Sequence, residues 1–336
     1  MTIAAPSGQQ LLTNHGLAAT GQVVIKANQF SLASSDTIAA TIRGPKGVSI
    51  SPNSTGGSAS ITTDCTANTT TITSTSGVVE LGQDGASYST ISMSTSAGEG
   101  ITLSANNGIG LLATEQVKIE AANGAININQ SGGTGDIVVT GSSIELLGGS
   151  ADQGSIQISH ATPGAIAIGG DSVHLIAGSS PTAGFTAIRS TGGAEVGIKG
   201  NLVLTSGGGS GNNTASIETS GASSPIKVSG GVVLNGGSSD AILATTGNSS
   251  DIMIDGEMTA TLNASSAGGN AYISTHQGAI GIKETGDVAL NGSANAHAYI
   301  STGEGQVNVT SGEGVSLRAG PGSSGELDAS ITAGGP

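Results

Sequence analysis

Carboxylates are the first residues in this chain that could do chemistry, and Asp251, Asp255 and Glu257 stand closest together. Hydrolysis of a glycoside needs two carboxyl groups, one on each side of the scissile bond. Nearly all of the acidic residues stand beside turn residues, where a solvated carboxylate is the expected state. The sequence therefore predicts no catalytic pair, and we expect the protein not to be an enzyme.

Aromatic side chains could form a platform for a sugar ring, but the chain has only two Phe, three Tyr and no Trp. Tyr272 and Tyr299 each come one residue before an apolar Ile, so both should face outward, one above the other. The pattern favours surface cover or a contact with a neighbouring subunit, and a sugar-stacking spot is the alternative.

The metal ligands that the sequence offers are scattered. The five His are never paired at ligand spacing, so we expect neither a metal nor any other cofactor. The single cysteine, Cys65, excludes a disulfide within the chain and is expected in or near the core.

The charge of the chain is acidic and unevenly distributed. Only 10% of the residues are charged, and the net charge is −14. Residues 1–46 carry Lys26, Arg43 and Lys46 against Asp36, which makes +2 and leaves −16 for the remaining 290 residues. Such a surface repels nucleic acid and anionic membranes. The three basic residues are candidate contacts to an acidic partner.

A repeat organises these residues. An apolar-x-Leu pair followed by small turn residues recurs with steps of 29, 29, 30, 28, 28 and 27 residues, and its leucines are Leu146, Leu175, Leu204, Leu234, Leu262, Leu290 and Leu317. A period of this length indicates units that bury their apolar side only by stacking on their neighbours. We expect these leucines to form one interior column.

Two further apolar series accompany the leucines, each within an apolar-x-apolar run typical of a strand with one buried face. The second series is Ile158, Ile188, Ile217, Ile242, Ile273, Ile300 and Ile331, and the third is Ile168, Ile198, Val228, Ile254, Ile282 and Val309. The abundant Gly, Ser and Thr disfavour helix. The sequence predicts an all-β parallel β-helix or β-solenoid with three strands per coil of about 27–30 residues.

This superperiod favours a single-chain coil over a three-chain intertwined β-helix, which stays an alternative. In the single-chain form each strand lies on the strand three places earlier, so one long corner per coil is expected. Asn235, Asn263 and Asn291 each follow a column leucine, and their amides could form a hydrogen-bonded ladder. A coincidence of composition is the other explanation of these three residues.

The first residues fit the repeat poorly. We interpret residues 1–46 as an N-terminal cap or attachment segment and residues 47–336 as the solenoid shaft. A solenoid needs cover at its open end, where backbone groups and core would otherwise be exposed.

Three stretches carry a resemblance to a known class of proteins. VKIEAANGAININ (117–129), GDIVVTG (135–141) and GDVALNG (286–292) resemble the Gly-Asp/Ala-Ile-x-apolar runs of β-helical shafts. Such shafts occur in the spikes and fibres of contractile-tailed bacteriophages and in related secretion-system tips. The resemblance implies a structural part of a virion or injection machine, often a homotrimer.

The function that we expect is a non-enzymatic virion structural protein: a bacteriophage spike, fibre or capsid-decorating element that forms a stiff rod. Its partners would be other virion proteins, bound through residues 1–46, further copies of the chain and a host surface receptor. It would assemble in the host cytoplasm and act on the extracellular particle. The alternatives are a bacterial surface or secreted adhesin and a polysaccharide-degrading tailspike. No signal peptide and no apolar run long enough to span a bilayer are found, which disfavours the adhesin.

Overall fold

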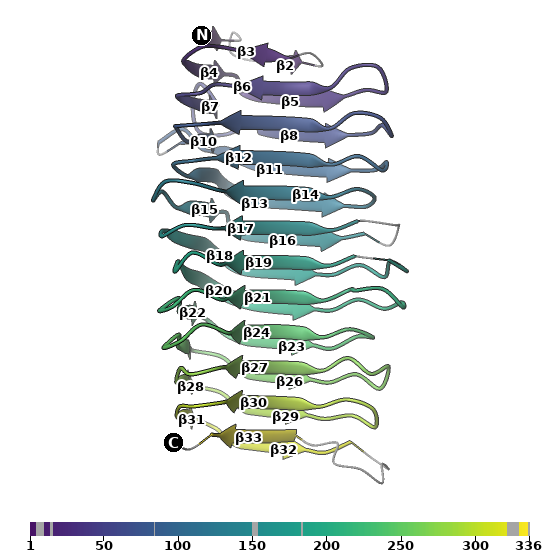
Figure 1. The fold of residues 1–336 in the computed structure, drawn as a ribbon, viewed down its shortest axis with the longest axis vertical. Helices are drawn as coiled ribbons and strands as arrows, with labels where there is room; N and C mark the ends of the chain where they lie inside the picture. Colours follow the sequence, from purple (N-terminus) through teal and green to yellow (C-terminus); the bar gives the residue numbers. More distant parts are fainter. Residues whose placement is uncertain are drawn as a thin grey trace.

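The chain folds as a parallel β-solenoid of about ten turns. The computed structural model describes residues 1–4, 10–13, 16–83, 85–149, 154–182, 184–320 and 329–334. In these residues all regular secondary structure is β-strand, and no helix is long and apolar enough to cross a membrane. The coils stack into a rod with the two ends of the chain at opposite ends (Figure 1).

Parallel pairing joins the strands into lines that run along the rod, and we call each line a ladder. The first ladder consists of β1 (Thr2–Ala4), β4 (Gln22–Lys26), β7 (Gly47–Ser51), β10 (Val79–Leu81), the start of β13 (Ile109–Ala121), β15 (Ile137–Thr140), the starts of β18 (Ala165–Ile176) and β20 (Glu195–Thr205), β22 (Ile226–Ser229), β25 (Ile252–Gly256), β28 (Ile280–Glu284) and β31 (Val307–Ser311).

The second ladder lies in the same 21-stranded sheet, because β13, β18 and β20 continue around the corner between the two ladders. It consists of β2 (Gln10–Thr13), β5 (Gln29–Ser34), β8 (Ser58–Thr63), β11 (Tyr88–Thr95), the ends of β13, β18 and β20, and β16 (Ser143–Gly148), β23 (Val232–Asn235), β26 (Ala260–Asn263), β29 (Val288–Asn291) and β32 (Val315–Arg318).

The third ladder is the separate 12-stranded sheet. It consists of β3 (Leu17–Ala18), β6 (Ala40–Arg43), β9 (Thr70–Ser74), β12 (Ile101–Ala105), β14 (Ile126–Gln130), β17 (Ile156–His160), β19 (Thr186–Ser190), β21 (Ala215–Thr219), β24 (Ala241–Thr245), β27 (Ala271–Thr275), β30 (Ala298–Thr302) and β33 (Ala329–Ala333).

The leucines of the repeat stack in register along the second ladder. Each is the register partner of the next: Leu146, Leu175, Leu204, Leu234, Leu262, Leu290 and Leu317. The first six are fully buried, whereas Leu317 in the terminal β32 is 50% exposed. The period that aligns these residues therefore also buries them, except where no described coil follows.

One member of the second apolar series is wrong by one residue. The register partner of Ile217 is Leu243, which is fully buried, and the predicted Ile242 is instead the partner of Ser216 and Tyr272 on the outer face. In the run Ala241-Ile-Leu two apolar residues compete for one inward position, and a slip by one residue exchanges the two faces of a strand. The backbone register, which the sequence does not show, decides between them.

The boundary predicted at residue 46 does not coincide with a change of architecture. β4, β5 and β6 pair in parallel with β7, β8 and β9, and Ile25, Leu32 and Ile42 continue the columns of Ile50, Ile61 and Ile72. Five of these six are isoleucine and all are fully buried. Spacings shorter than the regular period hid the repeat in this part of the chain.

Glycine and hydroxyl side chains build the corners between the third and first ladders. Buried Thr219, Thr245 and Thr275 each donate a hydrogen bond to a carbonyl of the following turn, at 2.6, 2.8 and 2.6 Å. These bonds satisfy backbone groups that the ladders cannot reach. The rows of threonine therefore have a structural role that the sequence interpretation did not assign.

The predicted asparagine ladder is present. The amide of Asn291 donates to Oδ1 of Asn263 at 2.8 Å, and the amide of Asn263 donates to Oδ1 of Asn235 at 2.9 Å. Asn235 in turn donates to Oγ1 of Thr205 at 3.3 Å. The hydrogen bonds all run toward the N-terminal end and connect four coils on the outer face of the second ladder.

Candidate functional site

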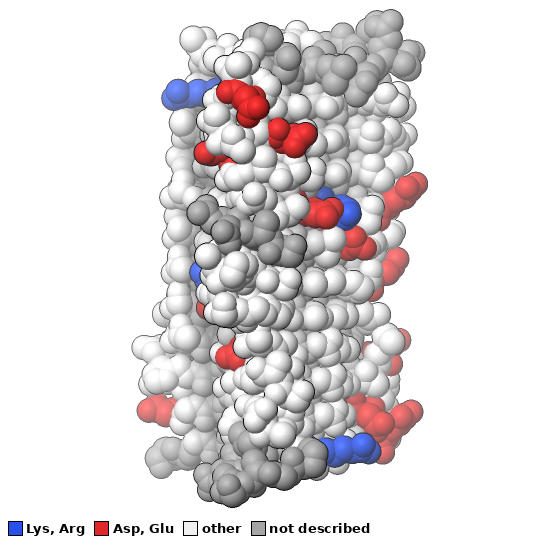
Figure 2. All heavy atoms as spheres, turned by 90° about the vertical axis from the view of Figure 1, so that its right-hand side faces the viewer, with Lys and Arg blue, Asp and Glu red and all other residues white. Residues whose placement is uncertain are grey.

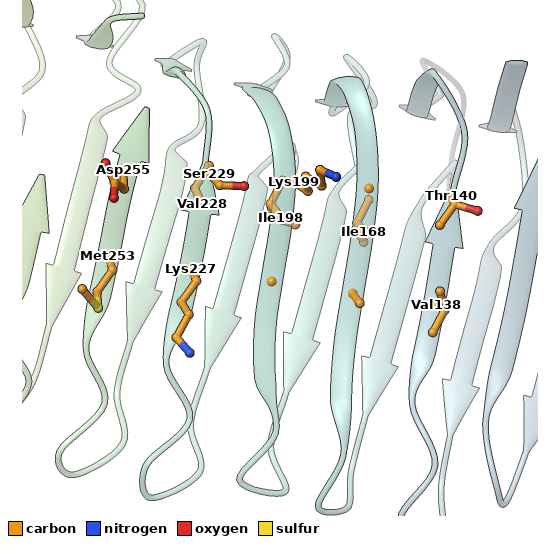
Figure 3. Close-up of a pocket in the computed structure, with 13 residues that line it drawn as sticks. Val138, Thr140, Ile168, Ile198, Lys199, Lys227, Val228, Ser229, Met253 and Asp255 are labelled. Carbon is orange, nitrogen blue, oxygen red and sulfur yellow. The ribbon is translucent and has the colours of Figure 1, made fainter. Parts of the chain in front are cut away.

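A large groove crosses the outer face of the first ladder (Figure 3). Its volume is about 630 Å³. It is lined by residues of β15, β18, β20, β22 and β25: Val138, Thr140, Ala167, Ile168, Gly169, Gly197, Ile198, Lys199, Lys227, Val228, Ser229, Met253 and Asp255. We call it the first groove.

The first groove is hollow because consecutive outward positions carry almost no side chain. Ala167 and Gly197 are register partners, and Gly169 is the next outward residue of the same strand. Val138 precedes this stretch, and Met253, 52% exposed, follows it. The alternation of a strand thus places small residues between larger neighbours and leaves an apolar floor across several coils.

Ammonium groups border the first groove. Nζ of Lys227 lies 2.7 Å from a carboxylate oxygen of Glu195, and Nζ of Lys283 lies 3.3 Å from Oδ1 of Asp255. Lys199 is exposed. Because these ion pairs are solvated, they contribute little to stability. The groove can therefore receive an apolar surface and hold acidic groups at its edge.

A smaller groove lies on the outer face of the third ladder and has a volume of about 240 Å³. We call it the second groove. Its lining comes from β19, β21, β24, β27 and the turns after them: Arg189, Ser190, Thr191, Glu218, Thr219, Ser220, Ile242, Ala244, Thr246, Tyr272 and Ser274. Arg189 and Glu218 are register partners, with Nη2 3.7 Å from Oε1.

Tyr272 and Tyr299 stack on each other beside the second groove. Their ring centroids are 4.9 Å apart and their planes differ by 3°. Burial raises the pKa of both phenols, and for Tyr272 the negative charges of Asp240 and Glu218 contribute in the same direction. Each ring thus covers one face of the other, and the second face of Tyr272 is turned toward its other register partner, Ile242.

The basic residues of the N-terminal segment do not form one cluster. Lys26, Arg43 and Lys46 are all exposed. Lys46 donates its backbone amide to Gly21 at the start of β4, whereas Lys26 ends the same strand. Four residues of extended chain, roughly 13 Å, separate those two positions. An acidic partner would meet them as separate charges.

The acidic residues near position 251 have local roles in the described structure. Oδ1 of Asp251 accepts a hydrogen bond from the amide of Ala279 at 2.8 Å, and Asp255 is paired with Lys283. Glu257 is exposed. In the described part of the chain, no group of three His, Cys, Asp or Glu side chains is placed to hold a metal ion.

Arg189 and Glu218 are site residues that the sequence interpretation missed. Each comes directly after a member of the second apolar series, Ile188 and Ile217, so the spacing that predicted the tyrosine stack also predicts this pair. Charges are otherwise sparse: the side of the rod formed by the long corners is mostly uncharged, with isolated acidic and fewer basic side chains (Figure 2).

Comparisons of the chain with protein-family models, with curated proteins and with solved structures give no match.

Proposed function

We propose that this chain is a non-enzymatic structural protein of a bacteriophage particle, a β-helical spike, fibre or decorating element whose role is mechanical. The observation that supports this proposal is continuity: parallel pairing runs from β1 to β33 in one chain. In this proposal each coil takes one strand from each ladder, which makes three strands per coil.

The physical basis of the role is a stiff, protected backbone. Amide and carbonyl groups of the inner coils bond to the coils on both sides, as in other stacked-strand structures that resist unfolding. The interior columns contribute about 25 cal/mol for each Å² of apolar surface removed from water. A protease needs a locally opened segment, and in such a rod opening an inner coil breaks contacts with two neighbours.

We further propose that the particle contains the chain as a homotrimer, with the first groove against a neighbouring copy. Charge complementarity supports this occupant, because the groove is bordered by Lys199 and Lys227 while the chain as a whole carries −14. Light scattering of the purified chain should give three times the monomer mass. Ala167→Arg, which fills the groove floor, should reduce it to the monomer, and Ala289→Arg on the second ladder should leave it unchanged.

The experiment that tests the virion role is immunogold electron microscopy of phage particles purified from lysates of the source culture. An antibody raised against this chain should label a fixed position on intact particles, and mass spectrometry should recover the chain in constant proportion to the capsid protein. Label on cell envelopes with none on particles would contradict the proposal and favour a surface adhesin.

A further inference from the structure

The second groove brings together side chains of complementary hydrogen-bonding type. One end carries the guanidinium of Arg189 and the carboxylate of Glu218 on adjacent strands, and the other end carries Tyr272. Ile242 and Ala244 add apolar lining between them. Hydroxyl groups complete the lining, from Ser190, Thr191, Thr219, Ser220, Thr246 and Ser274.

The charged pair keeps most of its hydrogen-bonding capacity. The 3.7 Å between Arg189 and Glu218 is longer than a hydrogen bond, and the two side chains are 39% and 37% exposed. The guanidinium carbon lies 5.7 Å from the centre of the Phe185 ring, which positions it on the sheet. Within the described structure, its Nε is buried with no hydrogen-bond partner.

A second polar group without a partner lies on the same face. Ser216 of β21 is fully buried, and its Oγ has no hydrogen-bond partner in the described structure. Its register partners are Ala187 and Ile242, so it lies in the outward row that leads to Tyr272. This face therefore carries more polar capacity than its own contacts use.

The chemistry of these groups selects the class of ligand. A guanidinium only donates hydrogen bonds and a carboxylate only accepts them, so neighbouring hydroxyls, which do both, match the pair. Glu218 and Asp240 near Tyr272 and the net charge of −14 oppose an anion. Arg189 opposes a cation. The free face of Tyr272, beside Ile242, suits the C–H face of a ring that is apolar on one side and hydroxylated at its edge.

We propose that the second groove is a binding site for a neutral saccharide, with Arg189 and Glu218 bound to adjacent hydroxyls and Tyr272 beside the sugar ring. This site requires neither a virion nor a trimer, so it is independent of the function proposed above.

Saturation-transfer NMR on the full chain tests the site, with maltotriose, chitotriose and mannotriose as neutral probes and trigalacturonate as the anionic one. At least one neutral probe should bind at millimolar concentration and shift the methyl resonances of Ile242, and trigalacturonate should not. Glu218→Gln and Tyr272→Ala should each weaken binding about tenfold or more. Glu195→Gln is the matched control, because it changes the ion pair with Lys227 beside the first groove and should leave binding unchanged.

Several outcomes would overturn the site. They are the absence of binding by every neutral probe, equal binding by trigalacturonate, and binding that neither variant weakens. Shifts of Ile242 with an uncharged Gly-Ser-Tyr peptide, but with none of the sugars, would indicate a peptide site instead. Circular dichroism confirms that each variant is folded. If a variant does not fold, the Ile242 titration of the unmodified chain decides the question.

Discussion

Glu284 shows how one side chain can act against the fold that contains it. It is the one buried acidic residue of the described structure, 2% exposed at the end of β28. Its register partner is Gly256, and a Cβ added there would meet Oε2 of Glu284 at 2.5 Å. Burial raises the pKa of the Glu284 carboxyl, the nearby amide of Met258 lowers it by less, and the charge of Asp255 raises it further.

The first prediction concerns the pH dependence of stability. The folded chain keeps the Glu284 proton to higher pH than the unfolded chain, so the free energy of unfolding falls as the pH rises above the ordinary carboxyl value of 4.5. Glu284→Gln should therefore raise the denaturation midpoint at pH 7 and leave it nearly unchanged near pH 4. Urea unfolding at both values measures this. Exposed Glu313→Gln is the control, and a variant equally stabilised at both values would contradict the explanation.

The second prediction concerns the asparagine ladder. Asn263 both donates and accepts, so Asn263→Ala removes two hydrogen bonds of 2.9 and 2.8 Å. The side chain is only partly buried, and the expected loss of unfolding free energy is about 1–2 kcal/mol. Urea unfolding gives the value, with Thr261→Ala on the same outward row as control. Equal losses in the two variants would indicate that the ladder adds nothing.

At the scale of strands and corners, glycine permits the coils to approach each other. Gly200, inside β20, has φ = 112°, and an added Cβ would clash with the carbonyl oxygen of Gly170 one coil earlier. At Gly281, inside β28, an added Cβ would have no atom within 4 Å, and φ is not positive. Two glycines within strands thus have different physical reasons to be there.

The third prediction compares these two positions. Gly200→Ala should lower the unfolding free energy by about 2 kcal/mol or more, from backbone strain and displacement of the Gly170 carbonyl. Gly281→Ala should be neutral or stabilise by up to about 1 kcal/mol, because it reduces the entropy of the unfolded chain. Thermal unfolding of both variants is the measurement. A stable Gly200→Ala chain would show that the corner can move.

The fourth prediction concerns the leucine column. Leu234→Ala should leave a cavity between Leu204 and Leu262 and cost about 2–5 kcal/mol. Leu317→Ala, at a side chain that is 50% exposed, should cost less than about 1 kcal/mol. The two substitutions remove the same atoms, so the difference in their urea midpoints measures burial. Equal midpoints would contradict the column.

At the scale of the whole molecule, each coil contacts mainly its neighbours along the rod. Such a chain behaves nearly as a one-dimensional array, in which stability is the sum of coil and interface contributions. Val315 and Leu317 of β32 are 49% and 50% exposed, so this coil has less buried surface than the inner ones.

The fifth prediction is therefore a gradient of amide protection. Hydrogen exchange followed by mass spectrometry should show the fastest exchange in β31 and β32 and the slowest in inner strands such as β20 and β23. Mixing with an equal amount of unlabelled chain controls for exchange of subunits. Uniform protection along the rod would indicate a single cooperative unit instead.

Particular residues show how far the sequence alone leads. The step of about 28 residues between leucines, and the position of each tyrosine before a column isoleucine, predict the stacking of Leu204 on Leu234 and of Tyr272 on Tyr299. This succeeds because the direction of a strand side chain alternates with period two, so equal spacing places equal residues on one face. The grooves were not predicted, since they depend on which outward positions of several coils meet.

The sequence by itself determined that the chain has no regular helix, that its apolar residues form columns and that its outward residues form rows. Only the tertiary structure decided that Leu243 rather than Ile242 points inward, that the strands before residue 46 belong to the solenoid, and that Glu284 is buried. The physical reason is that period and polarity are local properties of a strand. Register and burial are set by hydrogen bonds to residues about 27–30 positions away, across corners of variable length.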